Sequence, residues 1–356
     1  MIGPGTRLGR YEIITHLASG GMATVYVARA IGAAGFQRLV AIKRLHAHIA
    51  GDAQFVEMFL DEARLAARIR HPNVVPTLDL DNGDDGLYLA MEFVEGDSLL
   101  GLLKNSAKRG EPIPASIALR IMIDTLHGLD AAHDLKDDRG QPLNPVHRDV
   151  SPHNILVGTD GVARITDFGV ARAEERVTST RDGQIKGKLS YMAPETTTGE
   201  GFDRRADLFS AAIVLWETLT SRRLFKGAND LEVLRQLSLA PIPHIRDIDP
   251  TLPRSLDAVV AKGLQRDPAA RYATAAEFVR QQIRATVRDP RVADVLTPKG
   301  YPIGAKRICV DSNYYATFNR PNVTLVNLRK EPIKSITASG ITTANRSFDI
   351  DVIVFA

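Results

Sequence analysis

Cysteine is nearly absent from the sequence, because Cys309 is the only one in 356 residues. A single cysteine excludes an internal disulfide bond and a cysteine-rich metal site. Long apolar runs are also missing: the longest, around Phe209 to Trp216, is far shorter than the roughly 20 residues that cross a bilayer. The opening residues, MIGPGTRLGRYEI, contain no apolar core of signal-peptide length. We therefore expect a cytoplasmic protein without a membrane span.

An excess of either charge is lacking as well. Lys and Arg number 45 and Asp and Glu 42, so the net charge is only +3. That excess is too small to indicate binding to nucleic acid or to an anionic membrane. The composition, 44% hydrophobic and 24% charged, is typical of a soluble globular protein. It indicates no particular oligomeric state.

Charge divides the chain into two unequal parts. Residues 297–356 hold 8 basic and 4 acidic side chains, whereas the rest of the chain is close to neutral. The division falls at the segment RDPRVADVLTPKG, where two prolines and a glycine follow the last helical pattern. We expect a linker at residues 288–298 and a separate short segment at 297–356.

The long part begins with patterns of strands and continues with patterns of helices. The runs YEIITHL, TVYVARA and LVAIKRL are β-branched or alternating and predict three strands. The run DAQFVEMFLDEARLAARIR predicts an amphipathic helix that Asp52 caps and His71-Pro72 ends. Helical patterns dominate from Ser98 to Arg288, apart from the irregular segment 142–195. A small sheet-rich lobe followed by a larger helical lobe is the expected outline.

Three features of the first lobe have both an ordinary and a chemical interpretation. The glycine-containing turn at residues 17–25 lets backbone amides approach a phosphate, although a Gly-Gly hairpin turn is the more common explanation. Lys43 lies within an apolar strand, where a snorkelling lysine is common but a phosphate partner is a better reason. Glu62 lies on the apolar stripe of the predicted helix. An inward carboxylate there needs a cation, and Lys43 is the candidate; otherwise Glu62 is a solvated helix charge.

The irregular segment contains two further groups, HRDVSPHN at residues 147–154 and TDFG at residues 166–169. Asp149, Asn154 and Asp167 together offer oxygen ligands for a hard divalent cation and leave one carboxylate to accept a proton. Taken singly, each is more often a turn or cap residue.

In their order, VAIK, the inward Glu62, HRD followed by Asn, DFG and YMAPE resemble the bacterial eukaryotic-type (Hanks-type) Ser/Thr protein kinases. The resemblance covers residues 8–287. It implies an α+β, bilobal kinase fold, with an N-terminal extension at 1–10, an antiparallel-sheet N-lobe with one helix at 11–94 and a helical C-lobe at 95–287. It also implies that Asp207 holds the catalytic loop and that Arg271 pairs with Glu195.

The resemblance implies transfer of the ATP γ-phosphate to Ser or Thr hydroxyls of protein substrates. Asp149 would be the catalytic base, Lys43 would hold the α- and β-phosphates while paired to Glu62, and Asn154 and Asp167 would bind Mg²⁺. Adenine would lie among Val25, Ala41 and Leu156, beside the gatekeeper Met91 and the hinge 92–94. The full set of implied nucleotide-binding positions is Leu17, Ala18, Ser19, Gly20, Gly21, Met22, Ala23, Thr24, Val25, Ala41, Lys43, Met91, Glu92, Val94 and Leu156.

Two departures from the family pattern concern the site itself. Ala18 and Ala23 replace two of the usual three glycines, and we expect an alanine held at positive φ to cost about 1–2 kcal/mol. Ser151 stands where the family usually has a lysine on the γ-phosphate, and Lys188 where it usually has threonine. We expect an exchange, in which Lys188 supplies the cation and Ser151 the hydroxyl. The alternative is two independent losses, leaving a nucleotide-binding pseudokinase scaffold.

Regulation is implied by Arg148, since an arginine beside the catalytic Asp commonly pairs with a phosphate on the activation segment. Thr178, Ser179 and Thr180 are placed to carry such a phosphate by autophosphorylation. A flexible loop explains the same TST run.

Residues 297–356 have a different character. The runs RICV, VTLVN, IKSIT and DVIVFA predict short strands. The stretch from YPIGAKRICVDSNYYATFNRPNVTLVNLR to DIDVIVFA resembles an internal fragment of the Baeyer–Villiger type flavin monooxygenases. It has no Gly-x-Gly-x-x-Gly fingerprint for FAD or NADPH. Of two interpretations, a redox-sensing accessory and a non-functional fusion remnant, the remnant is favoured, because about 60 residues from a larger sheet bury little core.

Overall fold

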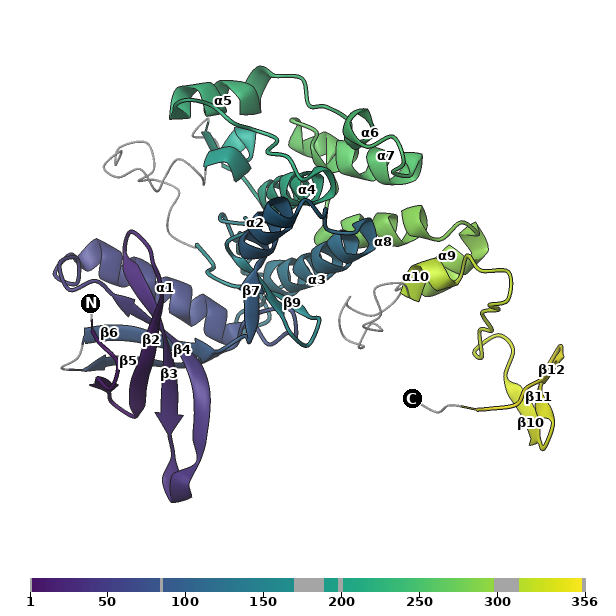
Figure 1. Ribbon diagram of the computed structural model, residues 1–356, viewed down its shortest axis with the longest axis horizontal. Helices are drawn as coiled ribbons and strands as arrows, with labels where there is room; N and C mark the ends of the chain where they lie inside the picture. Colours follow the sequence, from purple (N-terminus) through teal and green to yellow (C-terminus); the bar gives the residue numbers. More distant parts are fainter. Residues whose placement is uncertain (1, 84–85, 170–188, 198–200, 298–313, 354–356) are drawn as a thin grey trace.

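The computed structural model describes residues 2–83, 86–169, 189–197, 201–297 and 314–353. A small lobe is built from a sheet and helix α1, and a larger lobe from helices α2 to α8 (Figure 1). The expected α+β bilobal architecture is therefore confirmed.

The small lobe contains a six-stranded antiparallel sheet in the order β1-β2-β3-β4-β6-β5. The three strands predicted from the sequence are β2, β3 and β4, and all three are present. The bounds of the strands are β1 Arg7–Leu8, β2 Tyr11–Ser19, β3 Ala23–Ile31, β4 Gln37–Leu45, β5 Thr77–Gly83 and β6 Gly86–Glu92. A short 3₁₀ turn, η1 (Ala33–Gly35), joins β3 to β4.

Helix α1 (Ala53–Arg68) covers one face of this sheet. The Asp52 side chain accepts a hydrogen bond from the Gln54 N–H, so it is the predicted N-cap. Phe59 and Ala63 are buried against Leu45 and Leu89 of the sheet. The predicted amphipathic helix is thus confirmed, including its end before His71-Pro72.

Alternation along β4 decides which way Lys43 points. Ala41 and Leu45 belong to the apolar cluster under α1, whereas Val40 and Ile42 belong to the cluster on the opposite face. Because strand side chains alternate between faces, Lys43 shares the α1 face with Ala41 and Leu45. A lysine at position 42 or 44 would instead face away from α1.

The large lobe packs its helices around α4, whose side chains are buried on every side. Helices α3, α4 and α8 contribute much of one continuous apolar core. A three-stranded sheet, β7-β8-β9, lies at the edge of this lobe nearest the small lobe. The elements are α2 Leu99–Arg109, α3 Ala115–His133, α4 Arg205–Thr220, α5 Asp230–Leu239, α6 Ile245–Ile248, α7 Arg254–Gly263, α8 Ala275–Thr286, β7 Gly96–Ser98, β8 Ile155–Gly158 and β9 Ala163–Ile165, with 3₁₀ turns at η3 Leu189–Tyr191, η4 Pro194–Thr197 and η5 Pro268–Ala270.

The expected linker 288–298 contains a helix, α9 (Pro290–Leu296). Asp289 accepts hydrogen bonds from the Arg291 and Val292 N–H groups, and Pro290 occupies the first helical position. Proline is well tolerated there, because the first N–H of a helix has no acceptor. The prolines and glycine that indicated a linker therefore begin and follow a short helix.

Part of the C-terminal segment packs against the large lobe. Helix α10 (Tyr314–Thr317) lies near α8, and Tyr315 and Phe318 contact the apolar core. The Asn319 side chain donates to Thr286 O at 2.9 Å and accepts from Arg288 N at 2.7 Å, so it caps the end of α8. The remaining small sheet, β10 (Ile333–Thr337), β11 (Gly340–Thr343) and β12 (Ser347–Asp349), lies apart from both lobes in Figure 1.

The strand predictions for this segment were only partly right. IKSIT is strand β10, as predicted, whereas VTLVN at 323–327 and residues 351–353 of DVIVFA form no strand. RICV lies outside the described residues. The β-branched composition at 323–327 is suited to a strand, but no described strand pairs with it, and an unpaired strand is not stable in water. The strands that do pair with β10 and each other, β11 and β12, are not among the predicted runs.

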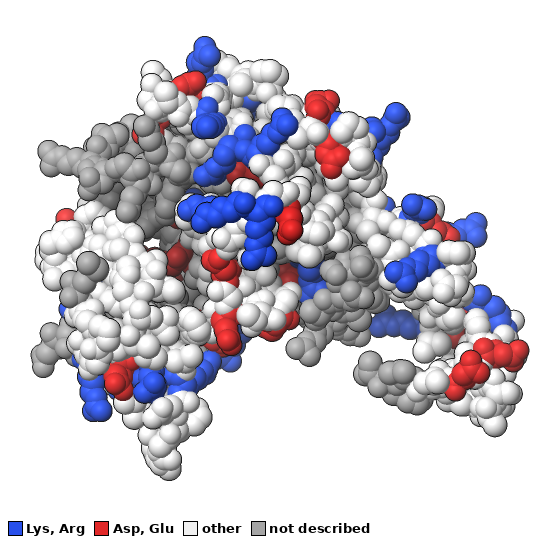
Figure 2. Space-filling model, viewed as in Figure 1, with Lys and Arg blue, Asp and Glu red and all other residues white. Residues whose placement is uncertain are grey.

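Across the parts of the chain that the structure describes, no helix has the length and apolarity that crossing a membrane needs. Lys and Arg are interspersed with Asp and Glu on the face shown in Figure 2, in keeping with the small net charge.

Candidate active site

Lys43 lies between two carboxylates that come from different parts of the chain. Its Nζ is 2.6 Å from Glu62 Oε1, on α1, and 2.8 Å from Asp167 Oδ1, which follows β9. The Lys43 side chain is only 8% exposed. Burial alone would lower the pKa of Lys43, but Asp167 and Glu62 outweigh it and hold the pKa above its ordinary value. The ammonium is therefore charged at physiological pH, and Glu62 is the inward carboxylate expected from the sequence.

The hairpin of β8 and β9 brings Asn154 and Asp167 to the same end of the small sheet. Asn154 precedes β8, Asp167 is the second residue after β9, and Ile155 pairs with Ile165. The Thr166 N–H donates to Asn154 O at 3.0 Å, which fixes the two strand ends together. Two oxygen-bearing side chains that lie 13 residues apart in the sequence thus become neighbours.

Asp149 is held from the same side. The Asn154 amide donates from Nδ2 to Asp149 O at 2.9 Å, and the Asn154 N–H donates to Ser151 O at 3.0 Å. Asp149 and Asn154 are each only 6% exposed. The turn from residue 149 to 154 is therefore closed by hydrogen bonds.

Asp207 holds the backbone that precedes Asp149. Its Oδ2 accepts from His147 N at 2.7 Å and its Oδ1 accepts from Arg148 N at 2.9 Å, while His133 Nε2 lies 2.8 Å from Oδ2. Burial alone would raise the pKa of Asp207, but the His133 and His147 interactions outweigh it and keep the pKa low. Arg148 has a φ of +67°, an unfavourable conformation for a non-glycine residue. The buried Asp207 carboxylate stabilises that conformation, which is the role the resemblance implied.

The DFG segment is fixed by His147. The Gly169 N–H donates to His147 O at 3.0 Å, and the rings of Phe168 and His147 lie 4.5 Å apart. Phe168 is buried in the core of the large lobe. Asp167 between them has a φ of +61°, and its carboxylate contacts Lys43. The arrangement aims the Asp167 side chain at the small lobe.

The implied adenine-contacting side chains come together in one apolar cluster. Ala41 and Met91 are buried there, and Val25, Val94 and Leu156 pack against them. Five positions from the sheet, the hinge and β8 therefore belong to one apolar cluster. At the hinge, the Glu92 N–H already donates to Pro76 O at 2.9 Å. A nucleotide would therefore have to form its hydrogen bonds with the Glu92 carbonyl and with the backbone groups of residues 93–94.

The expected strain at the two alanines of the glycine turn is absent. Ala18 lies in β2 and Ala23 in β3, and neither has a positive φ. The prediction was wrong because the hairpin carries both positions in extended conformation, which any residue adopts. Ala18 pairs across the strands with Val25, and Val25 pairs with Lys43, so this row of side chains faces the α1 side of the sheet.

Four of the residues named from the sequence lie outside the described part of the chain: Lys188, Thr178, Ser179 and Thr180. Ser151 is described: it is 1% exposed, and its Oγ has no hydrogen-bond partner in the described chain. The Arg148 guanidinium lies over the Phe202 ring at 5.3 Å.

Two further hydrogen-bonded arrangements include residues that lie outside the family motifs. The Tyr191 hydroxyl donates to Glu217 Oε2 at 2.6 Å and also contacts Arg223, and burial together with Glu217 raises the pKa of Tyr191. In the small lobe, Ser19, Thr24 and His46 form a chain of hydrogen bonds behind the glycine turn. Tyr191 lies in the YMAPE motif, so the sequence pointed to it. No sequence pattern predicts a contact between Thr24 and His46, because they are 22 residues apart.

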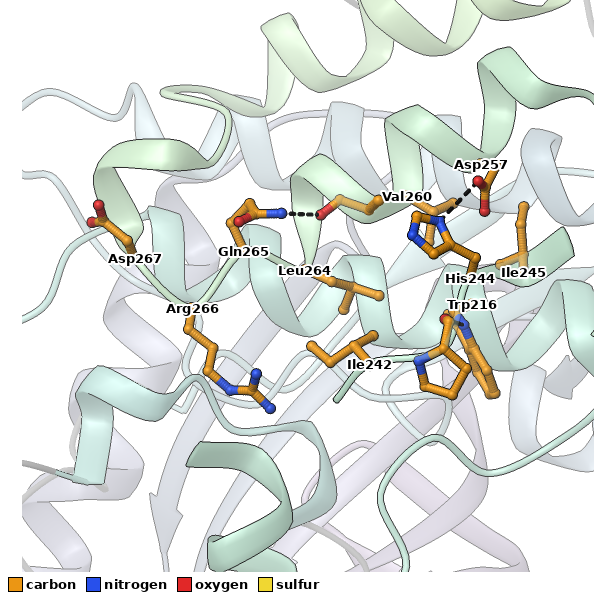
Figure 3. Close-up of a pocket in the computed structure, with 12 residues that line it drawn as sticks. Trp216, Ile242, His244, Ile245, Asp257, Val260, Leu264, Gln265, Arg266 and Asp267 are labelled. Carbon is orange, nitrogen blue, oxygen red and sulfur yellow. Dashed lines mark hydrogen bonds and ion pairs between the residues drawn. The ribbon is translucent and has the colours of Figure 1, made fainter. Parts of the chain in front are cut away.

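A cavity of about 320 Å³ lies in the large lobe, away from all of these residues (Figure 3). Its lining includes Trp216, Ile242, Leu264 and Arg266, and the His244 Nδ1 lies 2.9 Å from Asp257 Oδ2 at one end. None of the motif residues lines it. The chemistry-bearing side chains lie instead between the lobes.

A sequence model of the protein kinase domain matches residues 11–283. The chain belongs to the protein kinase family. It is 42% identical over 270 residues to the tyrosine-protein kinase MasK of Myxococcus xanthus, a match that covers 76% of this chain. It is 34% identical over 295 residues to the serine/threonine-protein kinase PrkC of Bacillus subtilis, a match that covers 83% of this chain.

The fold comparison agrees with this kinase assignment. The chain superimposes on the crystal structure of the Mycobacterium tuberculosis PknI kinase domain with a TM-score of 0.60 and 25% identity, covering 80% of this chain and 99% of that one. This kinase matches MasK and PrkC over 42% of the length of each, so it spans about two fifths of those relatives. The family match ends at residue 283, and the monooxygenase resemblance of residues 297–356 stays an expectation.

Proposed function

We propose that this kinase is an ATP-dependent enzyme of the cytoplasm that transfers the γ-phosphate to Ser and Thr hydroxyls of protein substrates. The observation that carries the proposal is Lys43 held between Glu62 and Asp167, with Asn154, which precedes the same β8–β9 hairpin, hydrogen-bonded to Asp149 O. Phosphoryl transfer needs alignment and neutralised charge more than covalent help from the protein. A buried, permanently charged ammonium at the junction of the lobes provides such a charge.

The residues present fit one or two Mg²⁺ ions bound together with ATP. Mg²⁺ prefers oxygen ligands and is usually bound through one or two protein side chains plus phosphate oxygens. Asn154 commits its Nδ2 to Asp149 O, which leaves the amide oxygen as its ligand atom, and Asp167 supplies a carboxylate nearby. No group of three or more His, Cys, Asp or Glu suited to a metal occurs in the described residues, so these two would act with the nucleotide. The ion would supply positive charge to the phosphates.

We propose that Asp149 accepts the proton of the acceptor hydroxyl. Its backbone is fixed by Asn154 and, through His147 and Arg148, by Asp207. A positioned carboxylate would accept the proton of the hydroxyl as its oxygen bonds to the γ-phosphorus, while the bond from that phosphorus to the β–γ bridging oxygen breaks and ADP leaves. Lys43, paired to Glu62, would hold the α- and β-phosphates meanwhile.

The identity of the acceptor amino acid is tested directly, because one relative, MasK, is named a tyrosine-protein kinase. Purified full-length protein is incubated with labelled ATP, Mg²⁺ and a generic basic protein, and the label is recovered by phosphoamino-acid analysis. We expect phosphoserine and phosphothreonine in wild type and at least about a 100-fold lower rate in Asp149→Asn, which removes the base but keeps the shape. Label on tyrosine alone would change the acceptor class, and no label in wild type would favour the pseudokinase scaffold.

The same incubation tests regulation. We propose that autophosphorylation falls on Thr178, Ser179 or Thr180, with Arg148 as the cation that faces the phosphate. Mapping of phosphopeptides that finds no modified residue between Val170 and Ser190 would remove this part while leaving the transfer activity intact.

We propose no catalytic role for residues 297–356. The segment resembles part of a flavin monooxygenase but contains no dinucleotide fingerprint, and its described portion caps α8 and forms a small separate sheet. A flavin absorbance spectrum in the purified protein would contradict this assignment.

A further inference from the structure

A chain of hydrogen-bonded side chains runs across the hairpin that carries residues 17–25. Ser19 Oγ lies 3.1 Å from Thr24 Oγ1, and Thr24 Oγ1 lies 2.9 Å from His46 Nε2. Ser19 belongs to β2, Thr24 to β3, and His46 directly follows β4. Three successive strands of the sheet are therefore joined through their side chains at the tip of the hairpin.

The chain lies on the face of the sheet that points away from the cleft. Ala18, Val25 and Lys43 pair with one another across the strands and face α1. Ser19 pairs with Thr24 one step along the same ladder, so this pair faces the opposite side. A nucleotide held by Val25 and Lys43 cannot touch Thr24 or His46 side chains, which can act on it only through the hairpin backbone.

The backbone at the tip is closed by the same residues. The His46 N–H donates to Met22 O at 2.9 Å, and the Gly20 N–H donates to Ala23 O at 2.9 Å. His46 thus binds the turn through both its main chain and its ring. Thr24 is only 4% exposed, so loss of its hydroxyl would leave the imidazole nitrogen facing an apolar group.

The state of the His46 ring suits this role. Burial, and then the neighbouring His48, lower the pKa of His46, so the imidazole is neutral at pH 7. The ring contacts the hairpin at the Thr24 hydroxyl and at the Gly21 backbone, and it lies beside the His48 ring, with the two centroids 5.3 Å apart. Thr24 therefore provides the side-chain hydrogen bond between this ring and the hairpin.

We propose that Thr24 and His46 are positioning residues that fix the hairpin at residues 17–25 over the nucleotide phosphates. The inference rests on the proposed ATP-dependent function. It changes the role implied for Thr24: its side chain lies on the face opposite Val25, so it affects nucleotide affinity through the hairpin and not by touching the nucleotide. Alanine at positions 18 and 23 makes the hairpin less adaptable than a glycine-rich one. Its tip must therefore be held in the correct place rather than adjust to the ligand.

The test compares Thr24→Val, which removes the hydroxyl at nearly constant volume, with Thr24→Ser, which keeps it. We expect Thr24→Val and His46→Ala to raise the KM for ATP by about 3- to 10-fold, the range expected from one hydrogen bond of ordinary strength. The KM for the protein substrate and kcat should change by less than about 2-fold, and Thr24→Ser should restore the wild-type KM for ATP. Titration calorimetry with Mg²⁺-ATP should show the same loss in affinity.

A matched control is available on the same hairpin. Thr15→Val removes an exposed hydroxyl of β2 and should leave the KM for ATP unchanged. Melting temperatures identify any variant that fails to fold, in which case Ser19→Ala provides a milder interruption of the same chain. If wild type neither binds nor uses ATP, the proposed function fails. If wild type is active and Thr24→Val and His46→Ala bind ATP as wild type does, or Thr24→Ser behaves like Thr24→Val, the positioning role is wrong.

Discussion

Arg271 and Glu195 form a bidentate ion pair inside the large lobe, with Nη1–Oε1 at 2.6 Å and Nη2–Oε2 at 2.7 Å. The Arg271 side chain is completely buried and also donates to the carbonyls of Gln265, Arg266 and Arg205. It therefore joins the turn at η4 to the segment before α8 and to the start of α4. A charge this deeply buried depends on its partner.

Breaking this pair should destabilise the protein strongly. We expect Arg271→Met and Glu195→Gln each to lower the free energy of unfolding by about 3–5 kcal/mol, because the remaining partner is left buried or poorly compensated. Urea-induced unfolding followed by tryptophan fluorescence and circular dichroism measures it. Arg64→Ala is the control: its pair with Asp61 is exposed on α1, and the expected loss is below about 1 kcal/mol. Equal losses for Arg271→Met and Arg64→Ala would mean that the buried pair is not a major contributor.

The two members of the Lys43–Glu62 ion pair should contribute to catalysis by different amounts. Lys43→Met removes the cation and should lower kcat/KM for ATP by at least about 100-fold, the cost expected for an electrostatic group aligned with transferring charge. Glu62→Gln keeps a hydrogen-bond acceptor but loses the charge, so a smaller loss of about 10-fold is expected, since Asp167 still faces Lys43. Steady-state rates at varied ATP give both values. Lys104→Met, an exposed lysine on α2, should match wild type, and a Glu62→Gln loss as large as that of Lys43→Met would show that Glu62 does more than orient the ammonium.

Local patterns were sufficient for much of the fold. The apolar spacing in α1 predicted that Glu62 points inward, and the apolar run around Lys43 indicated that this lysine lies within a buried strand. The order of the motifs then indicated which residues share a site. The hydrogen bond from Thr24 to His46 was not predictable in this way, because it depends on how three strands are registered rather than on any local spacing. The same reason explains the missed strands β11 and β12, since a run such as 323–327 becomes a strand only where a partner is available.

The exchange of Ser151 and Lys188 can be tested without placing Lys188. If Lys188 supplies the cation at the γ-phosphate, Lys188→Thr should lose at least about 10-fold in kcat, and Ser151→Lys in the same chain should restore part of it. Ser151→Lys alone buries a second cation at a position that is 1% exposed, and we expect it to lose activity too. Single and double variants are compared under saturating ATP. A double variant no more active than the worse single variant would show that the two changes are independent.

Two histidines, His127 in the large lobe and His71 between α1 and β5, predict that stability falls on acidification. His127 on α3 is 2% exposed, and its Nε2 has no partner among the described residues. Burial, then His71 and Arg120, lower the pKa of His127 to about 3, and burial lowers the pKa of His71 to about 4. Because the unfolded chain binds these protons near pH 6.5 and the folded chain does not, the stability contribution is complete above that pH and is lost as the pH falls through 6.5 toward 4.

For His127 the expected loss between pH 7 and pH 5 is about 2 kcal/mol, given an unfolded pKa of about 6.5. His127→Leu keeps similar volume and cannot be protonated, so its free energy of unfolding should fall less over the same range, by about that amount. Urea unfolding at pH 7 and pH 5 measures the difference, and His16→Gln, which changes an exposed histidine on β2, should retain the wild-type slope. The same pH slope in His127→Leu and wild type would mean that protonation of other groups, such as His71, accounts for the acid sensitivity.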